Sequence, residues 1–188
     1  MQKKTFKIYS FVNEFNLSDL SQLSKNINII YRNYDNINHL DNILKLKRYC
    51  KNTKRKFYLS NNIKLSIKLR LNGVYIPSFN KKINYIQSYS LPENFEIIGS
   101  AHNTFEINLK LKQKCSEIFL SPVFKVNKSK KFLGVTKFNF INLNTTINCI
   151  ALGGINEKNY KKINLLRSGG FASISWAKKN GLSKLRPL

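Results

Sequence analysis

Two pairs of residues near the C-terminal end of the chain have the types and spacing of a phosphate-binding backbone. Gly153 and Gly154 end one apolar run, and Ile174 and Ser175 end the next, which also begins with glycine. Glycine has no Cβ, so its backbone can approach an anion closely, and N–H groups at strand ends and helix starts are suitable donors to phosphate. We therefore expect these residues to bind phosphate. Tight packing of the glycines against another segment of the chain is the alternative.

Polar residues that can bind a substrate follow several other apolar runs. They are Arg32, Asn61, Asn80, Ser100 and His102. The carboxyl ends of parallel strands meet on one side of an α/β fold, so we expect these side chains to lie near the glycine pair. Two of them have structural alternatives, a helix cap for His102 and a salt bridge at the mouth of the fold for Arg32.

Eight short β-rich runs predict the strands that position these residues. They span 6–12, 27–33, 56–61, 73–77, 96–101, 117–124, 148–154 and 170–176. Most are continuously apolar, which is typical of strands that are buried on both faces.

Helical patterns separate most of these runs. Apolar residues at helical spacing occur in 40–46, 105–111 and 160–166, whereas 62–71 fits a helix or a strand and 134–146 fits a helix poorly. Alternating strands and helices predict an α/β fold, and about eight units predict a minimal (β/α)8 TIM barrel formed by a single domain over 1–188. A doubly wound open sheet is the alternative fold.

The positive charge of the chain favours anionic ligands but does not indicate which one. Lys and Arg number 33 against 9 Asp and Glu, a formal net charge of +24, which attracts phosphates, nucleic acid and anionic membranes. The basic residues are spread along the chain, with only short clusters at 52–56 and 127–131. This spread favours a solvated basic surface over a dedicated nucleic-acid interface.

The three cysteines, Cys50, Cys115 and Cys149, are far apart and odd in number. This pattern argues against a disulfide framework or a zinc site and indicates a reducing compartment. Cys149 lies in an apolar run and is expected in the core. We find no signal-peptide pattern and no membrane-spanning run, so we expect a cytoplasmic protein without a membrane partner.

Four motifs together resemble the thiamine phosphate synthase family and its thiazole tautomerase relatives. They are 98-IGSAHNTFE-106, 119-FLSPVF-124, 150-IALGGI-155 and 170-GFASIS-175, in the family's order. Fainter similarity at 27–33 and 73–77 extends the resemblance over nearly the whole chain. The sequence is therefore similar to a divergent member of this superfamily, and a TIM barrel is the fold that the resemblance implies.

The resemblance implies a transferase that joins a pyrimidine methyl diphosphate to a thiazole phosphate and releases pyrophosphate. Gly153, Gly154, Ile174 and Ser175 match the positions that hold the thiazole phosphate.

Three further positions match the family's contacts to the second substrate. Arg32 matches the basic residue that contacts pyrophosphate, and Ser100 lies where the family contacts the pyrimidine or pyrophosphate. Lys128 or Lys130 replaces a loop lysine, with the register between the two left open. Ser100 and Lys130 are the candidates for catalytic residues.

Several family positions are altered. The two magnesium-binding carboxylates of the family correspond to Asn61 and Asn80, and neutral amides bind Mg²⁺ weakly, so we expect no metal ligand and only weak support for Mg²⁺ as a cofactor. A Gln and a Lys of the family are replaced by Ile30 and Tyr34.

The tautomerase histidine is also absent, because its position is occupied by Ser121-Pro122. Among the acidic residues, we expect only Glu14, Asp35 and Glu157 near the binding end.

Three functions follow from these observations. The first is a thiamine phosphate synthase-like transferase in thiamine biosynthesis, whose partner is a small phosphorylated heterocycle and which can form a homo-oligomer. The second is a catalytically degenerate relative that binds a phosphate ligand. The third, which the spread charge disfavours, is a basic barrel that binds nucleic acid.

Overall fold

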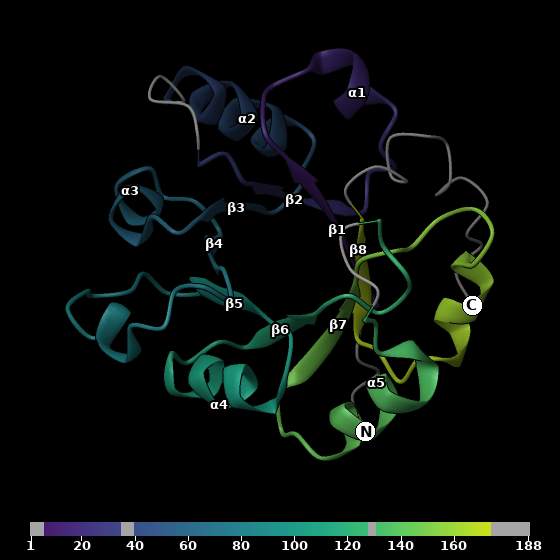
Figure 1. The fold of residues 1–188 in the computed structure, drawn as a ribbon. Coiled ribbons are helices and arrows are strands. Elements are labelled where there is room, and N and C mark those ends of the chain that lie inside the picture. Colours follow the sequence, from purple (N-terminus) through teal and green to yellow (C-terminus); the bar gives the residue numbers. More distant parts are fainter. Residues whose placement is uncertain (1–5, 35–39, 128–130, 174–188) are drawn as a thin grey trace.

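Eight parallel strands close into a barrel in the computed structural model, which describes residues 6–34, 40–127 and 131–173 (Figure 1). The strands are β1 (Lys7–Val12), β2 (Ile27–Tyr31), β3 (Phe57–Ser60), β4 (Gly73–Ile76), β5 (Glu96–Ala101), β6 (Glu117–Leu120), β7 (Asn148–Leu152) and β8 (Gly170–Ser173). Each strand pairs with its neighbour in the sequence, and β8 returns to β1, with Lys7 opposite Gly170. The predicted (β/α)8 barrel is confirmed, and the open sheet is wrong.

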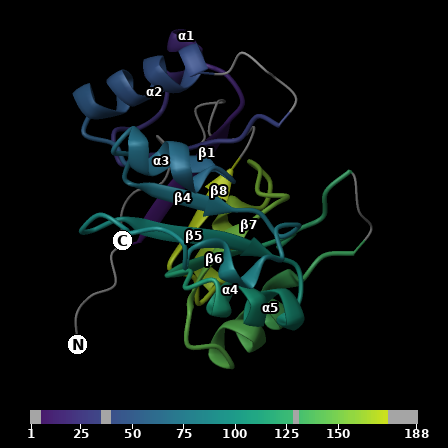
Figure 2. The same cartoon turned by 90° about the vertical axis from the view of Figure 1, so that its left-hand side faces the viewer.

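Helices and short 3₁₀ turns surround the barrel (Figure 2). They are α1 (Leu17–Ser21), α2 (Leu40–Asn52), α3 (Ile63–Lys68), η1 (Ile83–Tyr85), α4 (Thr104–Lys112), α5 (Gly134–Leu143) and η2 (Tyr160–Leu165). The ambiguous segment 62–71 contains a helix, which begins after the cap residue Asn62. The poorly patterned segment 134–146 also forms a helix. The third helical pattern, 160–166, is a 3₁₀ helix and not an α-helix.

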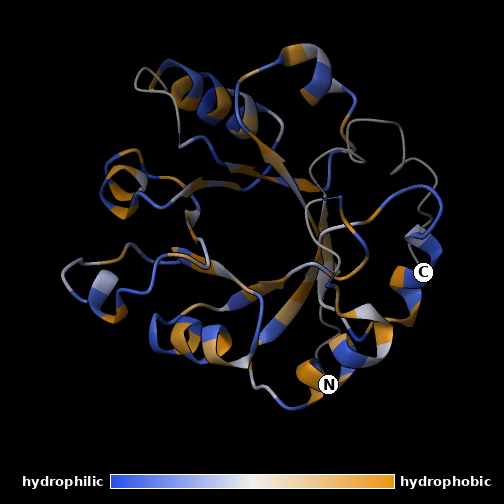
Figure 3. Ribbon diagram, in the orientation of Figure 1, coloured by the Kyte–Doolittle hydropathy of each residue, from blue (hydrophilic) through white to orange (hydrophobic). Residues whose placement is uncertain are grey.

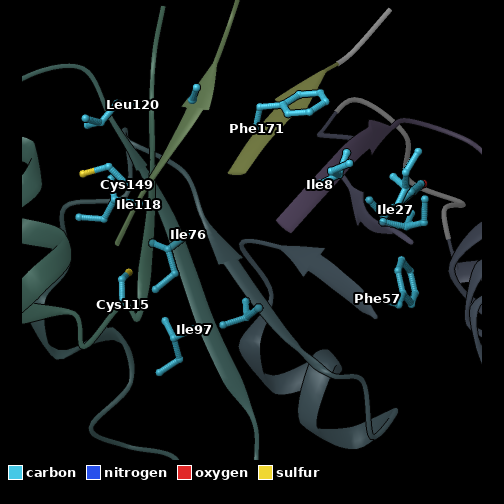
Figure 4. Packing of buried hydrophobic residues seen from close by; sticks show 14 of the residues in the cluster. Ile8, Ile27, Phe57, Ile76, Ile97, Cys115, Ile118, Leu120, Cys149 and Phe171 are labelled. Carbon is cyan, nitrogen blue, oxygen red and sulfur yellow. The ribbon is translucent and has the colours of Figure 1, made fainter. Parts of the chain in front are cut away.

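Two hydrophobic clusters stabilise the barrel. Half of the residues of the interior cluster are aromatic, and two pairs of their rings pack edge to face, with centroids 4.9 Å apart for Tyr9 and Phe119 and 5.2 Å apart for Phe11 and Tyr75. The outer cluster lies between the strands and the helices and includes Cys149, which is fully buried as expected (Figure 4). Apolar residues accordingly dominate the strands, whereas the surrounding helices alternate apolar and polar residues (Figure 3).

Two carboxylates, the buried Glu117 and the half-buried Glu96, lie at the amino-terminal end of the barrel. The Glu117 carboxylate accepts a hydrogen bond of 2.5 Å from the Tyr9 hydroxyl and pairs with Lys7 at 2.7 Å. Glu96 accepts a hydrogen bond of 2.5 Å from the Tyr58 hydroxyl. Burial, followed by the nearby carboxylates, raises the pKa of Tyr9 well above its usual value. These hydrogen bonds lie at the end of the barrel opposite the carboxyl ends of the strands, where Arg32 and the glycine pair are found. No helix in the described parts of the chain is long and apolar enough to cross a membrane.

Candidate functional site

A cavity of about 1050 Å³ opens beside the carboxyl ends of the strands. Its walls come from the segments that follow β2, β5, β6 and β7, from the last residues of β8, and from the start of α5. Arg32, His102, Gly153 and Gly154 line this cavity, so four of the predicted site residues share one space.

The glycine pair lies between the cavity and the loop that follows β6. Both residues have positive φ, +89° for Gly153 and +74° for Gly154. A Cβ on Gly153 would lie 3.0 Å from the Ser121 Oγ, and a Cβ on Gly154 would lie 2.4 Å from the carbonyl oxygen of Phe124. The glycines are therefore required by packing against the chain itself, and they also line the cavity. The two interpretations of the glycine pair are compatible.

The cavity is electropositive. Four cationic side chains line it: Arg32, Lys125, Lys131 and Lys137. None of the described residues that line it is an aspartate or a glutamate. Cations in a concave, partly dehydrated site attract anionic ligands more strongly than the same charges on a flat surface. The geometry is suited to a phosphate-bearing molecule.

Arg32 is held at the edge of the cavity by an aromatic ring. Its guanidinium lies 4.8 Å from the centroid of the Phe11 ring, a cation–π contact. Its backbone N–H donates to the Val12 carbonyl at 2.8 Å, which fixes the end of β2 beside the end of β1. The planar donor group of Arg32 is thus positioned to bind an anion.

Ser100 and His102 connect three loops at this end of the barrel. The Ser100 hydroxyl is buried and accepts hydrogen bonds from the Tyr75 hydroxyl at 2.8 Å and from the Ser78 backbone N–H at 3.0 Å. His102 Nδ1 donates to the Ser121 carbonyl at 2.7 Å, and Nε2 lies 3.2 Å from the Ser78 Oγ. Because a carbonyl only accepts, the proton resides on Nδ1.

These hydrogen bonds give Ser100 and His102 a defined positioning role. His102 lines the cavity, whereas Ser100 lies beneath the loop that carries Ser78. A ligand contact by either residue stays a prediction, as does catalysis by Ser100.

Glu106 is a carboxylate at this end of the barrel that was not predicted there from the sequence. It lies in the first turn of α4, and its side chain accepts from the His102 backbone N–H at 2.7 Å. Asn103 caps the same turn by accepting from the Glu106 N–H at 2.9 Å. The expectation that Glu14, Asp35 and Glu157 are the only acids near this end is therefore wrong, since helices that follow strands start there; Asp35 itself lies outside the described residues.

Asn61 and Asn80 lie next to each other and are joined directly. The Asn80 Nδ2 donates to the Asn61 Oδ1 at 2.7 Å. Asn61 follows β3, and Asn80 lies in the loop after β4. The structure thus brings these two predicted residues together, although neither lines the main cavity.

Four predicted site residues lie outside the described part of the chain: Lys128, Lys130, Ile174 and Ser175. Their roles stay predictions. Three lysines that line the cavity, Lys125, Lys131 and Lys137, were not among the predicted site residues. Lys125 follows a family-like motif directly, which is a usable signal, whereas Lys137 depends on how α5 packs.

Comparison with known proteins supplies the family. A model of thiamine monophosphate synthase matches residues 22–176, most of the chain. The chain belongs to the thiamine monophosphate synthase family. The match includes the glycine pair, Arg32 and both asparagines.

Individual relatives agree with this assignment. The thiamine-phosphate synthase of Prochlorococcus marinus strain MED4 is 29% identical over 140 residues, covering 73% of this chain and 38% of the relative. The thiamine-phosphate synthase of Pelagibacter ubique is 29% identical over 160 residues, covering 81% of this chain and 73% of the relative. The chain thus spans well under half the length of the Prochlorococcus relative.

Among solved structures, the fold resembles thiamine phosphate pyrophosphorylase from Pyrococcus furiosus. The TM-score is 0.74 at 15% sequence identity, covering 94% of this chain and 92% of that one. At this identity the likeness supports the barrel fold alone.

Magnesium, which the thiamine monophosphate synthase resemblance implies, does not fit the residues at its expected position. Mg²⁺ requires hard oxygen ligands in near-octahedral geometry and binds best to carboxylates. Here the two positions carry amides, and the Asn61 oxygen already accepts the Asn80 N–H. No group of three or more His, Cys, Asp or Glu residues suitable for a metal occurs among the described residues. We therefore derive no reaction step through Mg²⁺.

Proposed function

We propose that this protein acts in thiamine biosynthesis and binds a thiazole phosphate beside Gly153 and Gly154. The observation that carries the proposal is the cavity itself, lined by four cations and no described carboxylate, within a chain of the thiamine monophosphate synthase family. In the family resemblance, the glycine pair is the phosphate-binding position. The cations offset the charge of the phosphate, and the missing Cβ atoms let it approach the backbone.

We further propose that the protein couples the thiazole phosphate to a pyrimidine methyl diphosphate. The bond between the methylene carbon and the diphosphate oxygen breaks, its electrons leave with pyrophosphate, and the thiazole nitrogen donates its lone pair to that carbon. Arg32 lies at the edge of the same cavity and would bind the departing pyrophosphate by charge-assisted hydrogen bonds. The lysines of the cavity would stabilise the same charge.

A second function is favoured by one specific observation, the neutral pair Asn61 and Asn80. A barrel that keeps the phosphate-binding cavity and lacks the charged groups for diphosphate activation would bind a phosphorylated ligand without reaction. In this second function the protein would be a sensor or a carrier of that ligand.

The decisive experiment separates binding from coupling. Thermal denaturation and calorimetric titration are measured with thiazole phosphate, with the unphosphorylated thiazole alcohol and with inorganic phosphate. The proposal expects stabilisation by thiazole phosphate and much less by the alcohol. A matched variant, Arg32→Gln, tests whether the cavity is the site.

Product analysis then distinguishes the two functions. Thiamine phosphate formed from thiazole phosphate and pyrimidine diphosphate supports the transferase, and tight binding without product supports the non-catalytic relative. If no phosphorylated ligand stabilises the protein, both functions are refuted.

A further inference from the structure

The loop formed by residues 77–82, between β4 and η1, is held from behind by a buried lysine. Lys110 on α4 is 1% exposed, and its Nζ donates to the carbonyl oxygens of Pro77 at 2.7 Å and Asn80 at 2.9 Å. Its third acceptor is the Gln113 side-chain oxygen at 2.9 Å. All three acceptors are neutral, so the ammonium has no hydrogen-bonded carboxylate, which is unusual for a buried charge.

Gln113 reinforces the same attachment. Its Nε2 donates to the carbonyl oxygens of Asn80 at 3.0 Å and Lys82 at 2.9 Å. Helix α4 therefore fixes the 77–82 loop through several hydrogen bonds, and the chain keeps a positive charge directly beneath Asn80.

On the side facing the mouth of the barrel, the same loop is attached by neutral groups. Asn80 Nδ2 donates to Asn61 Oδ1, and Asn80 Oδ1 accepts from the Lys82 backbone N–H at 3.1 Å. An amide N–H thus occupies the direction in which the Asn61 oxygen would face a cation.

Three uncharged side chains, Tyr34, Ser60 and Phe79, lie beside this amide pair. The Tyr34 hydroxyl lies 2.7 Å from the Ser60 Oγ, and the Tyr34 ring packs edge to face on Phe79 with centroids 5.4 Å apart. None of these groups is a carboxylate that would attract a divalent ion.

We infer that the part of the barrel opening formed by Asn61 and Asn80 binds its ligand without a divalent cation. In this inference Lys110 is a positioning residue, because it holds the 77–82 loop that a metal ion would otherwise hold. A cation bound between the two positions would connect the loop after β3 to the loop after β4. Here the hydrogen bond between the two amides makes this connection, and Lys110 holds the 77–82 loop from the side of α4. The buried ammonium also repels any cation that approaches Asn80. The ligand group received here is uncharged or anionic, whether or not the protein couples thiazole phosphate.

The first experiment installs the missing carboxylates. Mg²⁺ and Mn²⁺ binding is measured by titration calorimetry and by the electron paramagnetic resonance of Mn²⁺, for the wild type and for the double variant Asn61→Asp/Asn80→Asp. We expect the double variant to bind either ion about tenfold more tightly than the wild type or better, since carboxylates are the preferred ligands. Asn84→Asp/Asn108→Asp, which adds the same charge at two exposed asparagines, is the matched control and should not gain the site.

Two results of this experiment would overturn the inference. One is a wild-type protein that binds Mg²⁺ as tightly as the double variant. The other is a double variant that gains no more affinity than the control, because then the two positions do not converge on one site.

The second experiment tests the charge of Lys110 separately from its packing. Lys110→Gln in the double-variant background keeps hydrogen-bond donors and removes the ammonium. We expect the triple variant to bind Mn²⁺ several-fold more tightly than the double variant, since a repelling charge is gone. A role in packing alone predicts weaker binding, because the loop would be less well held. Weaker or unchanged binding would therefore refute the electrostatic role of Lys110.

Discussion

Gly154→Ala tests whether the glycine pair is a site of close contact, and Gly134→Ala is its matched control. Both residues have positive φ, +74° and +68°, so alanine costs each of them about 1–2 kcal/mol of backbone strain. Only Gly154 is crowded. Its Cβ would lie 2.4 Å from the Phe124 oxygen and 2.7 Å from the Lys125 oxygen, whereas nothing lies within 4 Å of a Cβ on Gly134. Overpacking adds about 1–3 kcal/mol at Gly154 alone.

The assay is urea denaturation of both variants together with a titration of thiazole phosphate. We expect Gly134→Ala to lose about 1–2 kcal/mol and to keep its ligand affinity. Gly154→Ala should lose about 2–5 kcal/mol, and its affinity should fall about tenfold or more, because relief of the clash moves Lys125. Equal losses of stability in the two variants, with ligand affinity unchanged in both, would refute this account of the glycine pair.

Two further predictions concern buried polar groups. Burial lowers the pKa of Lys110 to about 8, against a partial opposing effect of Cys115 and Glu106. Between about pH 8 and pH 10.5 the lysine is therefore protonated in the unfolded chain and neutral in the folded one. The free energy of unfolding of the wild type, relative to that of Lys110→Met, should rise with pH across this window by up to about 3 kcal/mol. A fall or no change in this difference, measured by urea denaturation, would contradict the prediction. Tyr9→Phe removes the hydroxyl that donates to buried Glu117 and should cost about 1–3 kcal/mol of unfolding free energy. Calorimetric melting checks this, and an unchanged melting temperature would show that Lys7 and Asn148 satisfy the carboxylate without Tyr9.

The strands could be predicted from the sequence because the barrel imposes one requirement on all of them. A central parallel strand is covered on both faces, so it must be apolar along most of its length. Each predicted run contains an observed strand, for example Glu96–Ala101 in 96–101 and Phe57–Ser60 in 56–61. The helices were less predictable. In Tyr160–Leu165 the apolar spacing fits an α-helix, yet the segment forms a 3₁₀ helix.

The candidate site was predictable only where strand ends decide it. Arg32, Gly153 and Gly154 follow strands directly, so their convergence on one cavity follows from the topology. Lys110 carries no such signal. It lies in the last turn of α4, where a lysine is normally exposed, and only the packing of α4 against the 77–82 loop reveals that it is buried.

The two sides of the mouth differ in what determines their chemistry. At Gly153 and Gly154 the backbone itself packs closely against the loop that follows β6, and no side chain of the pair contributes charge. At Asn61 and Asn80 the side chains determine the charge. Replacing the amide nitrogen of each by an oxygen would convert the hydrogen-bonded amide pair into two adjacent carboxylates. Two carboxylates this close would require a cation or a proton to relieve their repulsion. The neutral amide pair needs neither a cation nor a proton. The inferred difference from a metal-dependent site therefore lies at Asn61 and Asn80 and not at the glycine pair.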